Sequence, residues 1–446
     1  MKLAFDVSDK PKFGQLIIFA IQQLLAIMAA TLVVPVIVGN GMSSAAALFG
    51  AGVGTLVYVI CTKKKSPVFL GSSFAFINSM FAAFAGGVSM ALGYLGLIIG
   101  AIFAGLVYVV IAIVVKFAGV NWINKLMPAV VIGPTVAIIG LSLAGNAIGD
   151  LQTGTELANP LICVLCGLVA LFVTTICSTF GKKMIKLIPF IIGILAGYAV
   201  SLIFTLIGNA LEIDALKVLS FDAFKLLTAD GFGVSTFFAV PEFTFATAFK
   251  GCVEITPAYV GAVAVAYIPV AFVVFAEHIA DHKNVSSIIE KDLLEDPGLS
   301  RTLLGDGIGS MFGAFFGGCP NTTYGESVAC VAITRNASVA TIIAAAIGAI
   351  LISFLSPFIA FVNSIPKCVM GGICMALYGF IAVSGLKMIK NVDLEENKNL
   401  FVVSVILIAG IGNLSLTFGK VTLTPVAVAL ILGIITNLVL SKKKAK

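Results

Sequence analysis

Long stretches of this chain carry apolar side chains without a single charged residue between them. Residues 13–62 and 66–115 are each uncharged throughout. An α-helix needs about 20 predominantly apolar residues to cross a lipid bilayer, so each stretch is long enough for two spans. This pattern predicts an all-α polytopic membrane protein and argues against a signal peptide followed by a soluble domain.

Charge clusters, Gly and Pro breaks and capping residues divide the apolar stretches into fourteen expected spans. Their approximate limits are 15–38, 43–61, 67–84, 91–115, 128–148, 160–180, 187–209, 257–281, 302–317, 319–334, 337–363, 368–386, 399–418 and 421–440. Cytoplasmic loops retain Lys and Arg. With the N-terminus inside, all but five of the 27 Lys and Arg residues are cytoplasmic; the exceptions are Lys217, Lys225, Lys250, Lys367 and Lys420. We therefore expect a protein of the cytoplasmic membrane with both termini in the cytoplasm.

The one long polar connection between expected spans covers residues 211–256 and separates two halves of seven spans each. Because seven is odd, two related halves would enter the membrane with opposite orientations, as in many secondary transporters. We expect residues 1–210 to form the first inverted repeat and residues 257–446 the second. The connection between them would be extracellular.

The third expected span of each half is interrupted. Residues 69–76 read Phe-Leu-Gly-Ser-Ser-Phe-Ala-Phe, and residues 317–326 read Gly-Gly-Cys-Pro-Asn-Thr-Thr-Tyr-Gly-Glu. Gly, Pro, Asn and Thr disfavour helix, and backbone leaves a helix at membrane depth only where protein or a cavity satisfies its polar groups. Paired breaks indicate a binding site near the midplane. Two packing kinks are the alternative explanation.

Acidic residues within the expected spans are few: Glu277, Asp281, Asp306 and Glu326. A carboxylate at the bilayer centre costs about 2.5–3.5 kcal/mol on insertion scales, and no Lys or Arg lies near the midplane to pair with it. Glu277 and Glu326 are therefore candidate functional groups. Asp281 lies one helical turn after Glu277, on the same face, and is either a proton-binding group or a helix-end charge. Asp306 follows Arg301 closely, so the alternative to a functional role is that Asp306 is a paired or solvated charge at a helix start.

Composition supports the membrane assignment and excludes several other classes. The chain is 60% hydrophobic and 11% charged, whereas soluble domains average about 45–50% and about 25%. Its nine cysteines are odd in number and lie mostly in apolar runs, which argues against a disulfide framework. The net charge of +6 comes from loops and tails, so we expect no nucleic-acid partner and contact with membrane lipid instead.

Two histidines, His278 and His282, are one turn apart in the same segment. A zinc site needs three or four convergent ligands, so we expect no metal and no other cofactor. Either histidine is instead expected to be a hydrogen-bond donor or a proton relay, with solvation the alternative for His282.

The predicted pocket combines two kinds of polar group. Ionised carboxylates only accept hydrogen bonds, whereas free backbone N–H groups at the broken segments only donate them. This combination suits a flat solute with alternating N–H and C=O groups, such as uracil or xanthine, with Phe74, Phe76 or Tyr324 over its faces. Carboxylates that share a cavity also interact in proton binding, which suits proton-coupled transport.

Blocks along nearly the whole chain resemble the uracil permeases of the nucleobase–ascorbate transporter family. The most specific block is 320–326, Pro-Asn-Thr-Thr-Tyr-Gly-Glu, because seven residues of unusual composition rarely recur by chance. The other blocks are 22–24, 30–35, 70–76, 276–281, 291–299, 332–335 and 365–372.

The resemblance implies a fold, a site and an activity. The fold would have a core domain of spans 1–4 and 8–11 and a gate domain of spans 5–7 and 12–14, with short antiparallel strands breaking spans 3 and 10. A homodimer through the gate domain is a further expectation. The activity would be proton-coupled uptake of uracil by alternating access. The implied substrate-binding residues are Glu277, Glu326, Phe74, Tyr324, Gly325 and Ala30.

Two positions depart from the uracil permease pattern. Asp281 stands where the best-known uracil carriers have a histidine, and Asp306 occupies a place that is acidic in many purine-transporting members. Proton coupling is therefore assigned to Glu277, Asp281 and Glu326 together. The alternative that the protein is a xanthine or urate symporter stays open. An anion carrier of the related sulfate-transporter kind would share the fold, but anions should avoid unpaired carboxylates. We find no nucleophile with a base at membrane depth, so an enzyme is not expected.

Overall fold

The computed structural model describes residues 3–119, 128–182, 184–229, 231–418 and 421–441. Helices of the first part are α1 (Phe13–Val38), α2 (Ser44–Cys61), α3 (Ile77–Ala83), α4 (Met90–Ala118), α6 (Ala129–Ser142), α7 (Ala144–Leu151), α8 (Pro160–Phe180), α9 (Met184–Leu187) and α10 (Pro189–Ala210). The 211–256 connection holds α11 (Asp222–Leu226), α12 (Val234–Phe237) and α13 (Thr244–Ala248). Helices after it are α14 (Pro257–Ile289), α15 (Leu299–Gly317), α16 (Gly325–Thr334), α17 (Val339–Ile352), α18 (Ser356–Ser364), α19 (Lys367–Met388), α20 (Asn397–Ile411) and α21 (Pro425–Ser441).

Within these described ranges, eight helical segments are long and apolar enough to cross a membrane. They are α1, α2, α4, α6 with α7, α8, α10, α14 and α19. Shorter apolar helices of 10–17 residues include α16, α17, α20 and α21. This content confirms the expectation of a mainly helical, multi-pass membrane protein. Several lysines used for the topology prediction lie outside the described residues: Lys2, Lys125, Lys183, Lys420, Lys442, Lys443, Lys444 and Lys446.

Helix limits differ from the expected spans in several places, and one of them is a break at Leu143 that divides the span 128–148 into α6 and α7. The expected span 337–363 is two helices, α17 and α18, and the span 399–418 is helical only as far as Ile411. Strands β3 (Leu416–Phe418) and β4 (Val421–Leu423) follow as an antiparallel pair. Thr417 and Thr422 are β-branched residues, which favour extended backbone. Helix α14 continues to Ile289, well past its expected end at residue 281.

The two interrupted segments do form short antiparallel strands, as the resemblance implies. β1 (Leu70–Ser72) pairs with β2 (Asn321–Thr323), with Gly71 opposite Thr322. Beyond the strands, Ser73 N donates to Pro320 O at 2.9 Å and Tyr324 N donates to Phe69 O at 3.3 Å. The backbone polar groups that leave the helices are thus satisfied inside the protein, which is the condition for such breaks at membrane depth.

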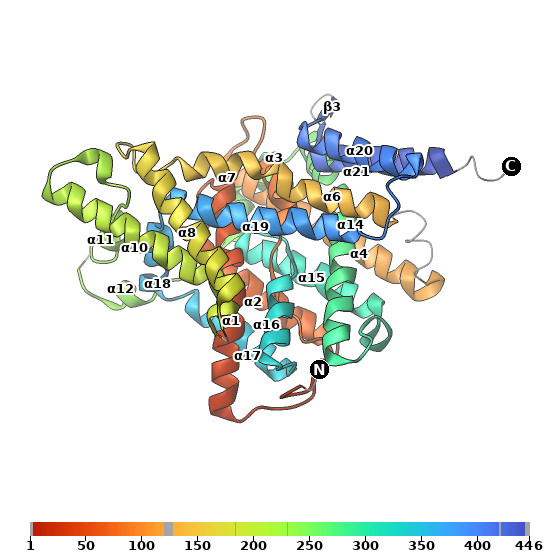
Figure 1. Cartoon of the computed structure of the whole chain (residues 1–446), viewed down its shortest axis with the longest axis horizontal. Helices are drawn as coiled ribbons and strands as arrows, with labels where there is room; N and C mark the ends of the chain where they lie inside the picture. The colour runs from red at the N-terminus through yellow and green to blue at the C-terminus, as the bar shows by residue number, and fades with distance from the viewer. Residues whose placement is uncertain (1–2, 120–127, 183, 230, 419–420, 442–446) are drawn as a thin grey trace.

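The helices pack in two groups. In the first, α15 packs against α2 and α4, α17 packs against α1 and α2, and α14 packs against α4. In the second, α19 packs against α6, α7 and α8, α10 packs against α8, and α20 packs against α21 and α6. Figure 1 shows α2 and α15 near the centre of the view, α8 and α10 towards its left and α20 with α21 at the upper right.

Helices α2 and α15 approach each other closely because glycines face glycines. A Cβ atom added to Gly54 would lie 2.7 Å from Gly309 O and 2.5 Å from Asn321 Nδ2. Asn321 Nδ2 also donates to Gly50 O at 3.1 Å. Small residues permit this kind of close helix packing inside membranes. The Asn321 side chain thereby links strand β2 to α2.

We therefore expect Gly54→Ala to destabilise the fold. The new methyl group would overlap backbone of α15 and the Asn321 side chain, and overpacking of this kind costs about 1–3 kcal/mol. The melting temperature of the detergent-purified protein should fall. Gly261→Ala on α14 is the matched control, because nothing lies within 4 Å of its new Cβ. Equal melting temperatures for the two variants would contradict this account of the α2–α15 contact.

Candidate functional site

A cavity of about 470 Å³ lies between the two groups of helices. Residues from the first group that line it include Ala26, Ser73, Phe74, Glu277, Asp281, Thr323, Tyr324, Gly325 and Glu326. Residues from the second group that line it include Val136, Ile139, Phe190, Leu377, Phe380 and Ile381. One wall is therefore polar and the facing wall is mainly apolar.

The polar wall is formed where the paired strands turn into helices. After β1 the chain enters a 3-10 turn (Phe74–Phe76) and α3, and after β2 it enters α16 at Gly325. The first N–H groups of a helix have no partner within that helix, and the helix dipole places partial positive charge there. Gly325, Ala329 and Ile333 line the cavity at four-residue spacing and are exposed. Solvent therefore reaches the face of α16 that borders the cavity.

Three carboxylates share this cavity. Glu277 and Asp281 line it from successive turns of α14, and Glu326 lines it from the first turn of α16. Asp281 Oδ2 accepts a hydrogen bond of 2.8 Å from Thr323 Oγ1, so strand β2 holds the orientation of this side chain. Asp281 is 8% exposed and lies two turns before the end of α14. The alternative of a helix-end charge is therefore wrong.

Of the other residues expected in the site, some line the cavity and others are buried away from it. Phe74 and Tyr324 line the cavity, and Tyr324 Oη donates to Ser72 O at 2.7 Å, which fixes its ring. Ala30 is 1% exposed and packs in the interior, while Ala26, one turn earlier on α1, lines the cavity in its place. Phe76 is also buried, stacked on Tyr267 with ring centroids 5.5 Å apart. Ala26 therefore lines the cavity where Ala30 was expected, and a role of Ala30 in binding stays a prediction.

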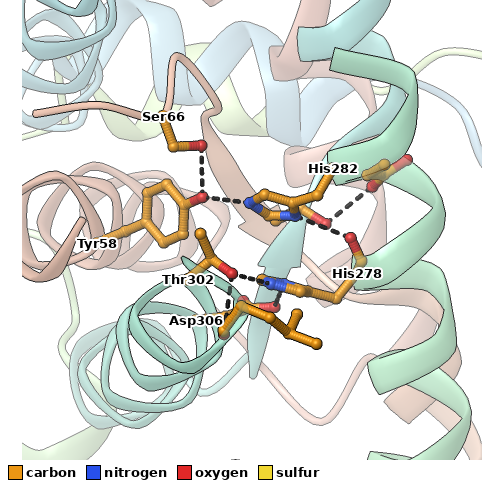
Figure 2. Close-up of polar contacts among 9 residues, drawn as sticks. Tyr58, Ser66, His278, His282, Thr302 and Asp306 are labelled. Carbon is orange, nitrogen blue, oxygen red and sulfur yellow. Dashed lines mark hydrogen bonds and ion pairs between the residues drawn. The ribbon is translucent and has the colours of Figure 1, made fainter. Parts of the chain in front are cut away.

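His278, His282 and Asp306 lie behind the polar wall rather than in the cavity. All three side chains are 0% exposed. Figure 2 shows His278 between Asp306 and Thr302, and His282 beside Tyr58. The His278 Nδ1 to Asp306 Oδ2 distance is 2.7 Å. The alternatives of a solvated His282 and a solvated Asp306 are therefore wrong, because both residues belong to a buried polar cluster.

Sequence reasoning gave no role to the residues that tie the wall together. Gln23 Nε2 on α1 donates to Ser327 Oγ on α16, and Ser327 Oγ accepts a second bond of 3.0 Å from Phe69 N. One hydroxyl thereby joins α1, the start of β1 and α16. The sequence feature that could have pointed to this link is Gln23, a polar residue within an apolar helix.

No group of three or more His, Cys, Asp or Glu side chains converges as a metal site among the described residues. The polar wall instead offers hydrogen-bond acceptors from the carboxylates and donors from helix N-termini. This arrangement can bind a small polar solute along an edge.

Comparison with known proteins identifies relatives across the whole chain. The model of a permease family, Xan_ur_permease, matches residues 14–418. A uracil permease of Bacillus caldolyticus is 38% identical over 98% of this chain and 95% of its own length. The uracil permease of Bacillus subtilis is 36% identical over 99% and 96%, and that of Escherichia coli K12 is 34% identical over 98% and 94%.

Solved structures with the same fold are more distant in sequence. The transmembrane domain of the cyanobacterial bicarbonate transporter BicA matches with a TM-score of 0.60 at 14% identity, covering 97% of this chain and 100% of that domain. The murine anion transporter Slc26a9, in its inward-facing state, matches with a TM-score of 0.61 at 11% identity, covering 98% and 70%. At these identities the likeness concerns the fold alone.

Proposed function

This chain belongs to the permease family described by the Xan_ur_permease model, and from that premise we propose that it takes up uracil across the cytoplasmic membrane by proton-coupled alternating access. Membership makes it a transporter rather than an enzyme. The substrate is inferred from relatives named uracil permeases that match nearly the full chain.

One observation carries the proposal: Glu277 and Glu326 line the same cavity as the N-terminus of α16. The edge of uracil alternates N–H donors with C=O acceptors. Carboxylates accept from its N–H groups, and backbone N–H groups at Gly325 and Glu326 donate to its C=O groups. Phe74 and Tyr324 supply aromatic surface for the base.

The proposed architecture is fourteen spans in two inverted repeats, residues 1–210 and 257–446. Pairing of β1 with β2 supports it, because the two strands interrupt the third expected span of each half. The two packing groups support a division into a core domain of spans 1–4 and 8–11 and a gate domain of spans 5–7 and 12–14. A homodimer through the gate domain stays a prediction.

Alternating access requires a site that faces one side of the membrane at a time. Lys186, Asn284 and Met388 also line the cavity. All three belong to segments expected on or near the cytoplasmic side. Under that topology the cavity would open towards the cytoplasm, which supports a site that faces one side of the membrane at a time.

Uptake of radiolabelled uracil by cells that express the protein tests this proposal. Accumulation should collapse with a protonophore and persist without sodium, because the buried carboxylates can bind protons. Xanthine and sulfate are the competitors that separate the alternatives. Uptake of radiolabelled xanthine without uptake of radiolabelled uracil would favour a purine symporter, and inhibition by sulfate or bicarbonate would favour an anion carrier.

Gly325 offers a test of the site geometry itself. A Cβ added there would meet only Asp281 Oδ1, at 4.0 Å, and would otherwise enter open space. Gly325→Ala should keep or raise stability, since such changes at compatible positions add about 0.4–1 kcal/mol. It should weaken uracil binding roughly tenfold, because the methyl group occupies the cavity beside Asp281. Gly379→Ala, with nothing within 4 Å of its Cβ, should leave calorimetric uracil affinity unchanged. Equal affinities for the two variants would place the substrate away from Gly325.

A further inference from the structure

Helix α14 has two chemically different sides. Glu277 and Asp281 line the cavity, whereas His278 and His282 project from α14 into the protein and are 0% exposed. Residues four apart lie on the same side of a helix, so the sequence places one carboxylate pair and one imidazole pair at the same depth. Figure 2 shows the imidazole pair directed away from the α14 backbone.

The two imidazoles connect α14 to two other helices. His278 contacts α15, with Nδ1 2.7 Å from Asp306 Oδ2 and Nε2 3.0 Å from Thr302 Oγ1. His282 contacts α2, with Nε2 2.6 Å from Tyr58 Oη. The rings stack on each other with centroids 4.0 Å apart. A continuous polar link therefore runs from α15 through α14 to α2.

This link matters because the backbone of α14 approaches the helices on its histidine side in few places, so side chains make most of the contact there. Helix α14 packs closely on α4 and α3 but only sparsely on α15. A side chain on a helix lies about 5–6 Å from the helix axis, so a rotation of about 20° would move a carboxylate by about 2 Å. A displacement of that size is enough to break a hydrogen bond.

We propose that His278 and His282 are positioning residues for Glu277 and Asp281. Through Asp306 and Tyr58 they fix the rotation of α14, so that its carboxylates lie beside the N-terminus of α16 in the polar wall of the cavity. Neither imidazole is among the described residues that line the cavity, so they act on substrate only through their neighbours. The inference rests on the proposed binding of uracil by Glu277.

His282 gives the cleaner test of the two. Removing the His278 imidazole would leave Asp306 buried without its partner, and such a change destabilises the fold for reasons unrelated to the site. At position 282 a side-chain amide can replace one ring nitrogen at a time, and the length of the side chain decides which one. The Gln amide lies the same number of bonds from Cα as His Nε2, and the Asn amide the same number as His Nδ1. His282→Gln can therefore keep the contact with Tyr58, whereas His282→Asn loses it.

Equilibrium uracil binding to the purified protein and initial uptake rates are the two measurements. His282→Asn and Tyr58→Phe should each raise Kd and KM about tenfold with Vmax nearly kept, as expected for loss of the buried hydrogen bond between His282 and Tyr58. Tyr58→Phe also removes the bond of 2.7 Å from Tyr58 Oη to Ser66 Oγ. His282→Gln should restore Kd to within about twofold. The double variant His282→Asn with Tyr58→Phe should be no worse than Tyr58→Phe alone, because both substitutions remove the contact between His282 and Tyr58.

The outcomes separate this inference from the proposed function. Failure of the unaltered protein to bind uracil would overturn the proposed function. Uracil binding that is equal in His282→Asn and His282→Gln would overturn the positioning role alone. Unchanged Kd with lost accumulation would also overturn it, because the histidine would then relay protons. If His282→Asn does not fold, as judged by size-exclusion chromatography, Tyr58→Phe alone decides, and a wild-type Kd in that variant contradicts the inference.

Discussion

Glu326→Gln is expected to abolish measurable uracil binding while the protein stays folded. Glu326 lines the cavity from the first turn of α16, where its carboxylate is a pure acceptor. An amide in its place can present N–H to the N–H of the base, which leaves two buried donors face to face. A buried unsatisfied polar group costs about 1–3 kcal/mol, and loss of the charge-assisted bond adds to that cost. Binding should weaken by at least about 100-fold.

Isothermal calorimetry on the purified variant measures this loss independently of transport. Glu254→Gln is the matched control, because Glu254 is an exposed carboxylate in the 211–256 connection, 2.9 Å from Ser89 Oγ. Its uracil affinity should equal that of the unaltered protein. If Glu326→Gln also retained that affinity, Glu326 would not be a substrate ligand, and the acceptor groups for the base would have to be Glu277 and Asp281.

Local sequence was sufficient to predict the two helix breaks and to identify Glu277 and Glu326 as candidate functional groups, whereas the pairing of the breaks as strands was implied by the family resemblance. Gly71 and Pro320 lie in segments that disfavour helix, and backbone leaves a helix at membrane depth only where protein or a cavity satisfies its polar groups. Glu277 was identifiable because an uncharged run precedes it and no cation lies near. These inferences depend on the chain itself and on the solvent around it.

Features that depend on tertiary packing could not be predicted in the same way. Asp306 looked like a charge near Arg301, but its partner His278 comes from another helix at 2.7 Å. The burial of His282 depends on Tyr58 of α2, far away in sequence. Ala30 and Ala26 differ by one turn of α1, and only the depth at which α1 crosses the strand pair decides which of them lines the cavity. Hydrophobic periodicity predicts which face of a helix is buried, but it does not predict at which turn the helix crosses a neighbouring element.

Asp281→Asn is expected to separate substrate binding from proton coupling. Asp281 and Glu277 are one turn apart, so the charge of each opposes ionisation of the other and the two bind protons as a pair. Asn cannot bind a proton, but its Oδ1 can still accept the hydrogen bond from Thr323 that Asp281 Oδ2 accepts at 2.8 Å. The geometry of the wall is therefore kept. Uracil should still bind, proton-driven accumulation should fall to equilibrium, and exchange of internal for external uracil should survive because it needs no net proton movement.

Proteoliposomes with an imposed pH gradient measure accumulation and exchange side by side. Asp296→Asn is the control carboxylate, since Asp296 is exposed and pairs with Lys65 at 2.6 Å, outside the cavity. That variant should accumulate uracil normally. Normal accumulation by Asp281→Asn over about pH 5–8, the range in which perturbed carboxylates can titrate, would assign coupling to Glu277 or Glu326. Loss of both exchange and binding would instead make Asp281 a substrate ligand, with Oδ1 as the oxygen that faces the open space beside Gly325.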